Sequence, residues 1–150
     1  MKETPRDART RVRMMPGAIT LNGFIGKDKR SLPEIIAADE VKLQSLNRTA
    51  TEIAERMKYF VDASFSTFDG KITIEGIYVV ETEVTRGYLQ CPYSHGGKIR
   101  KSTTCLTNTK TGVTVTWTAM NIHLIEDHGF FEGKGSTYRL EPEQLVKALF

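Results

Sequence analysis

The chain has 150 residues, of which 39% are hydrophobic and 26% charged, the usage of a globular protein with one domain and a substantial core. No apolar run approaches the ~18 residues of a membrane-spanning helix, and no apolar segment follows the basic N-terminus as a secretory signal requires. Two cysteines are too few for a disulfide framework, so we expect a cytoplasmic protein, free of membrane contacts, with reduced thiols.

The net charge of +3 comes from the first thirteen residues. Residues 1–13 balance at 5 − 2 = +3, whereas residues 14–150 balance at 16 − 16 = 0. No apolar periodicity precedes Met14, so we expect 1–13 to be a flexible basic leader that packs little against a single α+β domain, 14–150. Such a leader could contact nucleic-acid phosphates, although a solvated leader is the simpler interpretation. The neutral body argues against a broad nucleic-acid face.

The first expected element of the domain is a short strand. Ile19 and Leu21 alternate with other residues within 17–24, which indicates a strand at the edge of a sheet. A turn rich in glycine and charged residues follows it.

Two helices are then predicted. Ser31 can cap a helix, and Pro33 and Glu34 suit its first turn, so this segment predicts a helix over about 32–46. A second capping box precedes apolar residues at helical spacing and predicts a helix over about 50–63. Because their connection is short, we expect the two to form a helical hairpin.

The apolar period changes from 3.6 to 2 after Gly70, which indicates strands. Residues 72–84 read as one long strand, or as a pair bent at Gly76. Threonine-rich segments at 101–107 and 113–117 are joined by a five-residue loop that ends in glycine, and they predict a hairpin.

A further helix is expected from Thr118 to His128, with Gly129 in the C′ position, and Pro142 begins a short C-terminal helix. The helices are segregated from the strands rather than alternating with them. The predicted class is therefore α+β, with a helical hairpin packed on an antiparallel sheet and two helices after the sheet.

Metal-ligand residue types are concentrated in one region. Both cysteines and all three histidines lie there: Cys91, His95, Cys105, His123 and His128. The gaps Cys91-x3-His95 and His123-x4-His128 allow two side chains to reach one ion. We expect Cys91, His95, His123 and His128 to bind one metal ion, and thiolate with imidazole favours zinc.

Each of these residues also has a simpler interpretation. Cys91 and His95 suit a plain turn with a buried thiol. On an ideal helix His123 and His128 lie about 140° apart, so they converge only if the last turn loosens. His128 would also favour a helix C-terminus without any metal. Cys105 lies within a predicted strand as a small hydrophobe, and it is the reserve ligand should a histidine fail.

In ligand types this set resembles a zinc knuckle followed by a helix. It departs from the two-Cys two-His finger, because the knuckle has one cysteine and 27 residues separate the pairs rather than about 12. We therefore assign no family and carry over no family function.

The segment 129–139 mixes glycines, aromatic residues and polar residues. Gly133-Lys134-Gly135-Ser136 is similar in composition to a phosphate cradle, but its spacing is not that of a Walker A motif and it follows a helix. A structured glycine-rich loop is the simpler interpretation. Its polar side chains would surround the metal if His128 binds it, and they are Glu132, Lys134, Ser136, Tyr138 and Arg139.

Three functions remain open. The first is a zinc-binding module that contacts a protein or nucleic acid through 129–139 or the basic leader. The second is a metal-dependent enzyme with an open coordination position and Glu126 or Glu132 as general base. The third is a metal-free accessory domain. Four protein donors favour the first, because catalytic sites keep one position open.

Overall fold

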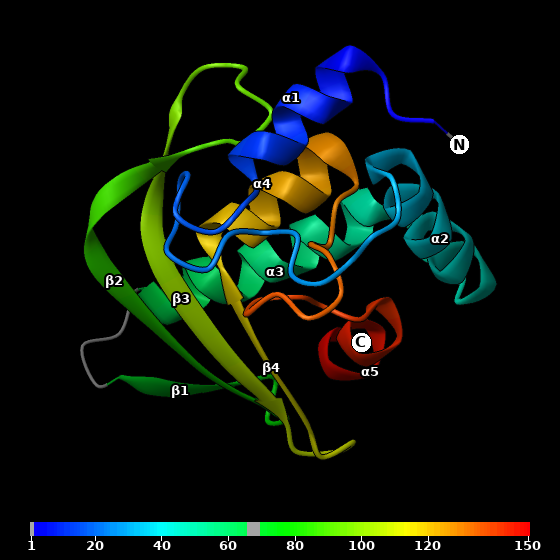
Figure 1. Cartoon of the computed structure of the whole chain (residues 1–150). Coiled ribbons are helices and arrows are strands. Elements are labelled where there is room, and N and C mark those ends of the chain that lie inside the picture. The colour runs from blue at the N-terminus through cyan, green and yellow to red at the C-terminus, as the bar shows by residue number, and fades with distance from the viewer. Residues whose placement is uncertain (1, 66–69) are drawn as a thin grey trace.

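The chain folds as an α+β domain, which confirms the predicted class (Figure 1). The structure is a computed structural model that describes residues 2–65 and 70–150. The helices are α1 (Pro5–Arg13), α2 (Leu32–Ser45), α3 (Ala50–Phe65), α4 (Ala119–His128) and α5 (Pro142–Leu149). The strands are β1 (Lys71–Ile74), β2 (Tyr78–Gln90), β3 (Lys98–Asn108) and β4 (Val113–Thr118). No helix in the described part of the chain has the length and apolar character needed to cross a membrane.

The strands form an antiparallel meander in the order β1-β2-β3-β4. The predicted β3–β4 hairpin is confirmed, and the Asn108 side chain accepts from the backbone of Lys110 and Thr111 in its turn. Of the two interpretations of 72–84, the bent pair is correct. Glu75 and Gly76 both have positive φ, which is the geometry of a tight hairpin turn between β1 and β2.

Helices α3, α4 and α5 pack against the curved sheet, with α3 on β1 and β2 and also against α4 (Figure 1). Met57 and Phe60 on α3 are fully buried against Leu106 and Trp117 of the sheet. Burial of a side chain of this kind stabilises the fold by ~1.5–3 kcal/mol. This first core orders the sheet and, through α3, one side of α4.

A second hydrophobic core lies between the N-terminal segment, α2 and α4. Met14, Leu32, Leu124 and Phe130 are buried in it, and so is Cys91, the first residue after β2. Apolar contacts therefore pack the end of the β2–β3 hairpin against α4, whether or not a metal ion binds there.

The strand expected within 17–24 is absent. This segment is a series of turns in which Gly17 donates to the Thr20 carbonyl and Phe24 to the Met14 carbonyl. Gly23 has φ of 69°, and a Cβ there would lie 2.4 Å from the Met14 oxygen. The close approach of the Gly23 backbone to that of Met14 determines the conformation of this segment. Leu21 is 84% exposed instead of facing a sheet.

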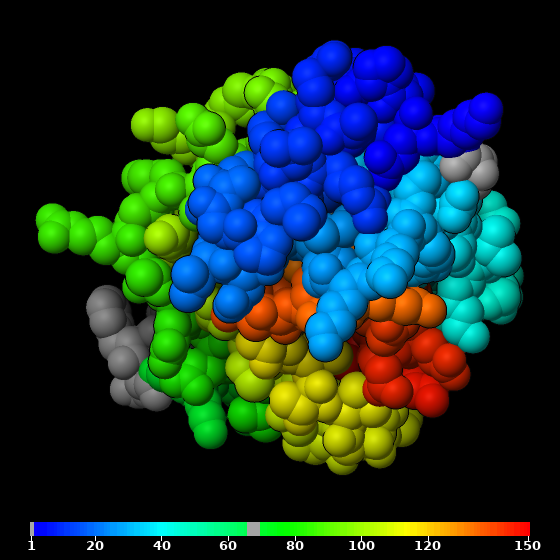
Figure 2. All heavy atoms as spheres, viewed as in Figure 1, coloured from blue at the N-terminus to red at the C-terminus, as the bar shows by residue number. Residues whose placement is uncertain are grey.

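The segment expected to be a flexible leader forms hydrogen bonds with the body of the domain. Residues 5–13 form α1, capped by reciprocal bonds between Thr4 and Asp7, and the N-terminal segment covers the upper part of the face seen in Figure 2. Arg11 donates to the backbone carbonyls of Asp28 and Arg30, and Arg13 donates to the Pro92 carbonyl. These contacts are hydrogen bonds from arginine side chains to backbone carbonyls. They leave no apolar periodicity in the sequence from which they could be predicted.

We predict that Arg11→Gln lowers Tm by several degrees, while the matched change Arg9→Gln at an exposed position of the same helix leaves it unchanged. Charged hydrogen bonds are worth ~1.5–3 kcal/mol, and 1 kcal/mol shifts the Tm of a chain of this size by about 2–4 °C. Thermal unfolding followed by circular dichroism measures both variants. Equal melting of the two would show that α1 contributes nothing through Arg11.

Candidate metal centre

The knuckle, defined as residues 91–97, turns back on itself directly after β2. The Ser94 N–H donates to the Cys91 carbonyl at 2.9 Å, and the Tyr93 N–H points at the Cys91 sulfur at 3.4 Å. Ser94, Gly96 and Gly97 all have positive φ, which tightens the turn. The knuckle therefore places Cys91 and His95 around one point, as their spacing predicted.

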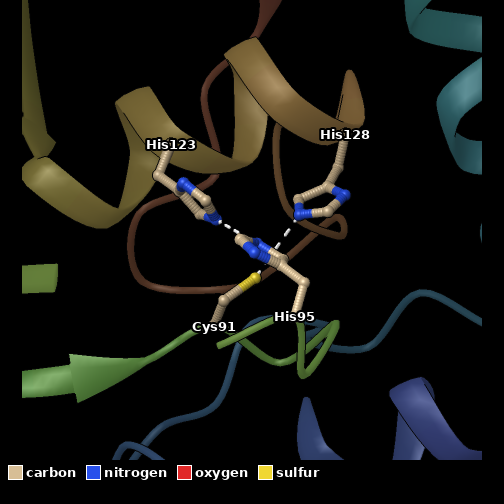
Figure 3. Close-up of side chains that lie close together, drawn as sticks. All are labelled: Cys91, His95, His123 and His128. Carbon is tan, nitrogen blue, oxygen red and sulfur yellow. Dashed lines mark hydrogen bonds between the residues drawn. The ribbon is translucent and has the colours of Figure 1, made fainter. Parts of the chain in front are cut away.

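Helix α4 supplies the two other histidines. Thr118 caps its start, and Gly129 ends it in the left-handed conformation, with the Phe130 N–H bonded to the Leu124 carbonyl. The helix stays regular as far as His128, so the loosened last turn that the sequence required is not present. Instead, both imidazole rings turn from the helix toward the knuckle, and their reach brings the nitrogen atoms together (Figure 3).

The four side chains converge on one point (Figure 3). The Cys91 Sγ lies 3.4 Å from the His128 Nε2, and the His95 Nε2 lies 2.7 Å from the His123 Nε2. All four potential ligand atoms lie within 4.8 Å of one another. A tetrahedral zinc ion with ligands at ~2.0–2.3 Å separates its ligand atoms by ~3.3–3.6 Å, so small side-chain shifts would accommodate one.

The other candidate residues do not join this group. Cys105 is exposed on β3, opposite Thr116 of β4, where it is a surface thiol rather than a reserve ligand. Glu126 forms an ion pair with Lys58 on α3. Glu132 is buried and hydrogen-bonded to Asn121 and Ser136.

Two neighbouring side chains hold the histidines in place. Tyr93 stacks on His128 with ring centroids 3.9 Å apart and planes at 10°. The Asp127 carboxylate lies 3.5 Å from the Nδ1 of His123, which leaves Nε2 directed at the cluster, a common arrangement around metal-bound histidines. Sequence reasoning missed both residues. The i,i+4 spacing of His123 and Asp127 was a usable signal, whereas nothing in the sequence indicated the stacking of Tyr93.

Burial sets the protonation of the cluster. It lowers the pKa of His128 to about 4 and also lowers that of His123, so both rings are neutral at pH 7 and able to donate an electron pair. Burial raises the pKa of the Cys91 thiol, an effect that the backbone N–H groups of Tyr93 and Ser94 oppose. A cation at the centre would favour the thiolate directly.

The fold and the cluster together define a small α+β domain in which one Cys and three His side chains meet between a hairpin end and a helix. The chain matches no protein-family model, no curated protein and no solved structure. Its function is therefore inferred from its own residues.

The loop 129–139 is held by buried polar contacts. Asn121 and Ser136 donate to the two oxygens of Glu132, and Arg139 binds Asp39 through two hydrogen bonds of 2.6 and 2.8 Å. A Cβ at Gly133 would lie 2.0 Å from the backbone oxygen of Ile25. Gly133 thus serves close packing, which agrees with a structured loop and not with a phosphate cradle.

The loop does not form the pocket that was expected around the metal ligands. Glu132 and Tyr138 line a cavity beside Thr118 and Met120, in the first turn of α4, whereas His128 is the last residue of that helix. A ten-residue helix is ~15 Å long, so the cavity lies away from the Cys–His cluster and not around it.

We predict that Glu132 makes stability fall as pH rises from about 4.5 to about 7. Burial raises the pKa of Glu132 from 4.5 to about 7, outweighing the hydrogen bonds from Ser136 and Asn121, so the folded state keeps a proton that the unfolded state has lost. The contribution of Glu132 to the free energy of unfolding should then decrease by up to ~3 kcal/mol across this window and level off above it.

Urea unfolding of the wild type and of Glu132→Gln across pH 4–8 measures this effect. The difference between the two proteins isolates Glu132, because the histidines titrate in both. A difference in unfolding free energy that stays constant over the whole range would contradict the prediction.

Proposed function

We propose that the chain is a zinc-binding module in which the metal is structural and the protein acts by binding a macromolecular partner. The observation that carries the proposal is the approach of four donor atoms, from two segments far apart in the sequence, to within 4.8 Å of one another. Thiolate sulfur and imidazole nitrogen in a four-donor set are the ligands of structural zinc.

The surroundings of the cluster support a structural role. Cys91 is only 4% exposed and belongs to the second hydrophobic core, so an ion bound there would join the end of the β2–β3 hairpin to α4. Because the site would not exist in the unfolded chain, the free energy of metal binding would appear as folding stability. A thiolate ligand also suits a reducing compartment, and we include a cytoplasmic location in the proposal.

A metal-dependent enzyme is the second candidate, because His95 is exposed and could leave one coordination position to water. The two general bases expected from the sequence do not support it. Glu126 is paired with Lys58, and Glu132 is bonded to Asn121 and Ser136. Asp127 is the carboxylate beside the cluster, and it contacts His123.

We predict that Cys91→Ser and His123→Ala each lose the metal and lower Tm by at least about 5 °C, since loss of a few kcal/mol of binding free energy has this effect in a chain of this size. Cys105→Ser is the matched control, because it removes an exposed thiol outside the cluster and should change neither quantity. Elemental analysis of the purified protein gives the metal and its stoichiometry.

The same measurements separate the three functions. A stoichiometric zinc that all four ligand variants release supports the structural site. Retention of zinc by His95→Ala, with the other three variants still losing it, would favour the enzyme. A wild-type protein that takes up no zinc and melts identically with and without it would refute the proposal in favour of a metal-free domain.

A further inference from the structure

One long stretch of the chain contains no acidic residue. Between Glu83 and Glu126 there is neither aspartate nor glutamate, yet five basic residues occur there: Arg86, Lys98, Arg100, Lys101 and Lys110. The rest of the chain balances at 16 − 18 = −2, since the totals are 21 basic and 18 acidic residues. Positive charge without local compensation is therefore concentrated in this stretch.

The fold gathers four of the five basic residues on one part of the sheet. Within the described residues, β1 pairs with β2 as far as Glu81, and β4 pairs with β3 as far as Thr103. Beyond these points β2 and β3 continue as a two-stranded arm, defined as residues 84–90 and 98–102, which leads to the knuckle (Figure 1). The exposed basic residues on it are Arg86, Lys98, Arg100 and Lys101.

An exposed aromatic ring lies among these charges. Tyr88 is 60% exposed and stands directly opposite Arg100 in the β2–β3 register. An exposed tyrosine alone is ordinary, but a tyrosine between basic residues with no acidic residue on the arm offers a stacking face beside phosphate-binding groups.

A cavity of about 280 Å³ opens at the base of the arm. Arg100 and Lys101 line it together with Ser102, while Leu21 contributes apolar surface. Its volume suits one small group such as a nucleobase, and the hydroxyl group of Ser102 could bond to the polar edge of a base.

We infer that the arm and its cavity bind single-stranded nucleic acid, with phosphates on the four basic residues and unpaired bases on Tyr88 and in the cavity. The inference rests on the proposed function, since the metal would hold the knuckle that joins the two strands of the arm. A duplex hides its base faces from Tyr88 and from the cavity, so a single strand is the matching form. The surface is narrow, which agrees with the neutral charge of residues 14–150.

The test uses the zinc-loaded full chain and fluorescein-labelled twelve-nucleotide probes of mixed sequence, as single-stranded RNA, single-stranded DNA and duplex DNA. Fluorescence anisotropy at 50 and 200 mM salt should show binding of the single strands, with the duplex bound at least tenfold more weakly. The slope of log affinity against log salt should be no steeper than about −2.8, since four phosphate contacts contribute ~0.7 each.

Matched variants locate the surface. Lys101→Glu should weaken binding at least tenfold, whereas Lys110→Glu should not, because Lys110 is also exposed but lies in the turn at the opposite end of β3. Tyr88→Leu should weaken binding at least about fivefold with an unchanged salt slope, and Tyr88→Phe should restore it, since stacking needs only the ring. Zinc content and Tm of all four variants should match the wild type.

The outcomes separate the two proposals. A zinc-loaded chain that binds no single-stranded probe at 50 mM salt overturns the inference and leaves the zinc module standing. Equal losses from Lys101→Glu and Lys110→Glu, or a duplex bound as tightly as the single strands, also overturn it. Single-strand binding by a chain that takes up no zinc, with the variants behaving as expected, supports the surface and refutes the proposed metal centre.

Discussion

Helix α4 is buried on two sides at once, and this constraint determines the geometry of the site. Ile122 and Ile125 pack in the core under the sheet, while Met120 and Leu124 pack in the core that contains Cys91. A helix held between two cores cannot rotate without exposing apolar surface on one of them. Its remaining side is therefore fixed in direction, and the histidines at positions 123 and 128 extend from it toward the knuckle.

Buried polar contacts hold the loop 129–139, which the two hydrophobic cores do not fix by themselves. The pair formed by Arg139 and Asp39 has both side chains only 7% exposed, and the Glu132 carboxyl accepts bonds from Asn121 on α4. A buried polar group that loses its partner leaves its desolvation penalty uncompensated. These groups therefore allow few alternative arrangements of the loop 129–139. The loop in turn forms one wall of the cavity at the start of α4.

The Cys–His cluster and the cavity lie at opposite ends of α4 and are connected through the strands β2 and β3. The knuckle ends the arm of β2 and β3, and Arg13 on α1 binds the knuckle at the Pro92 carbonyl. An ion at the cluster would thus restrain both the arm and the N-terminal segment. This arrangement is consistent with the proposal that the buried cluster and the exposed basic surface serve one binding module.

Local features of the sequence determined the helices α2–α5, the β3–β4 hairpin and the four residues of the cluster. Capping boxes, period changes and ligand spacing act within a few residues, so a single sequence displays them. Only the tertiary structure decided that α1 packs on the body, that 17–24 forms turns, and that Tyr93 stacks on His128. Those features depend on arginine–carbonyl bonds, close backbone approach and ring contacts between distant segments, which leave no periodic pattern in the sequence.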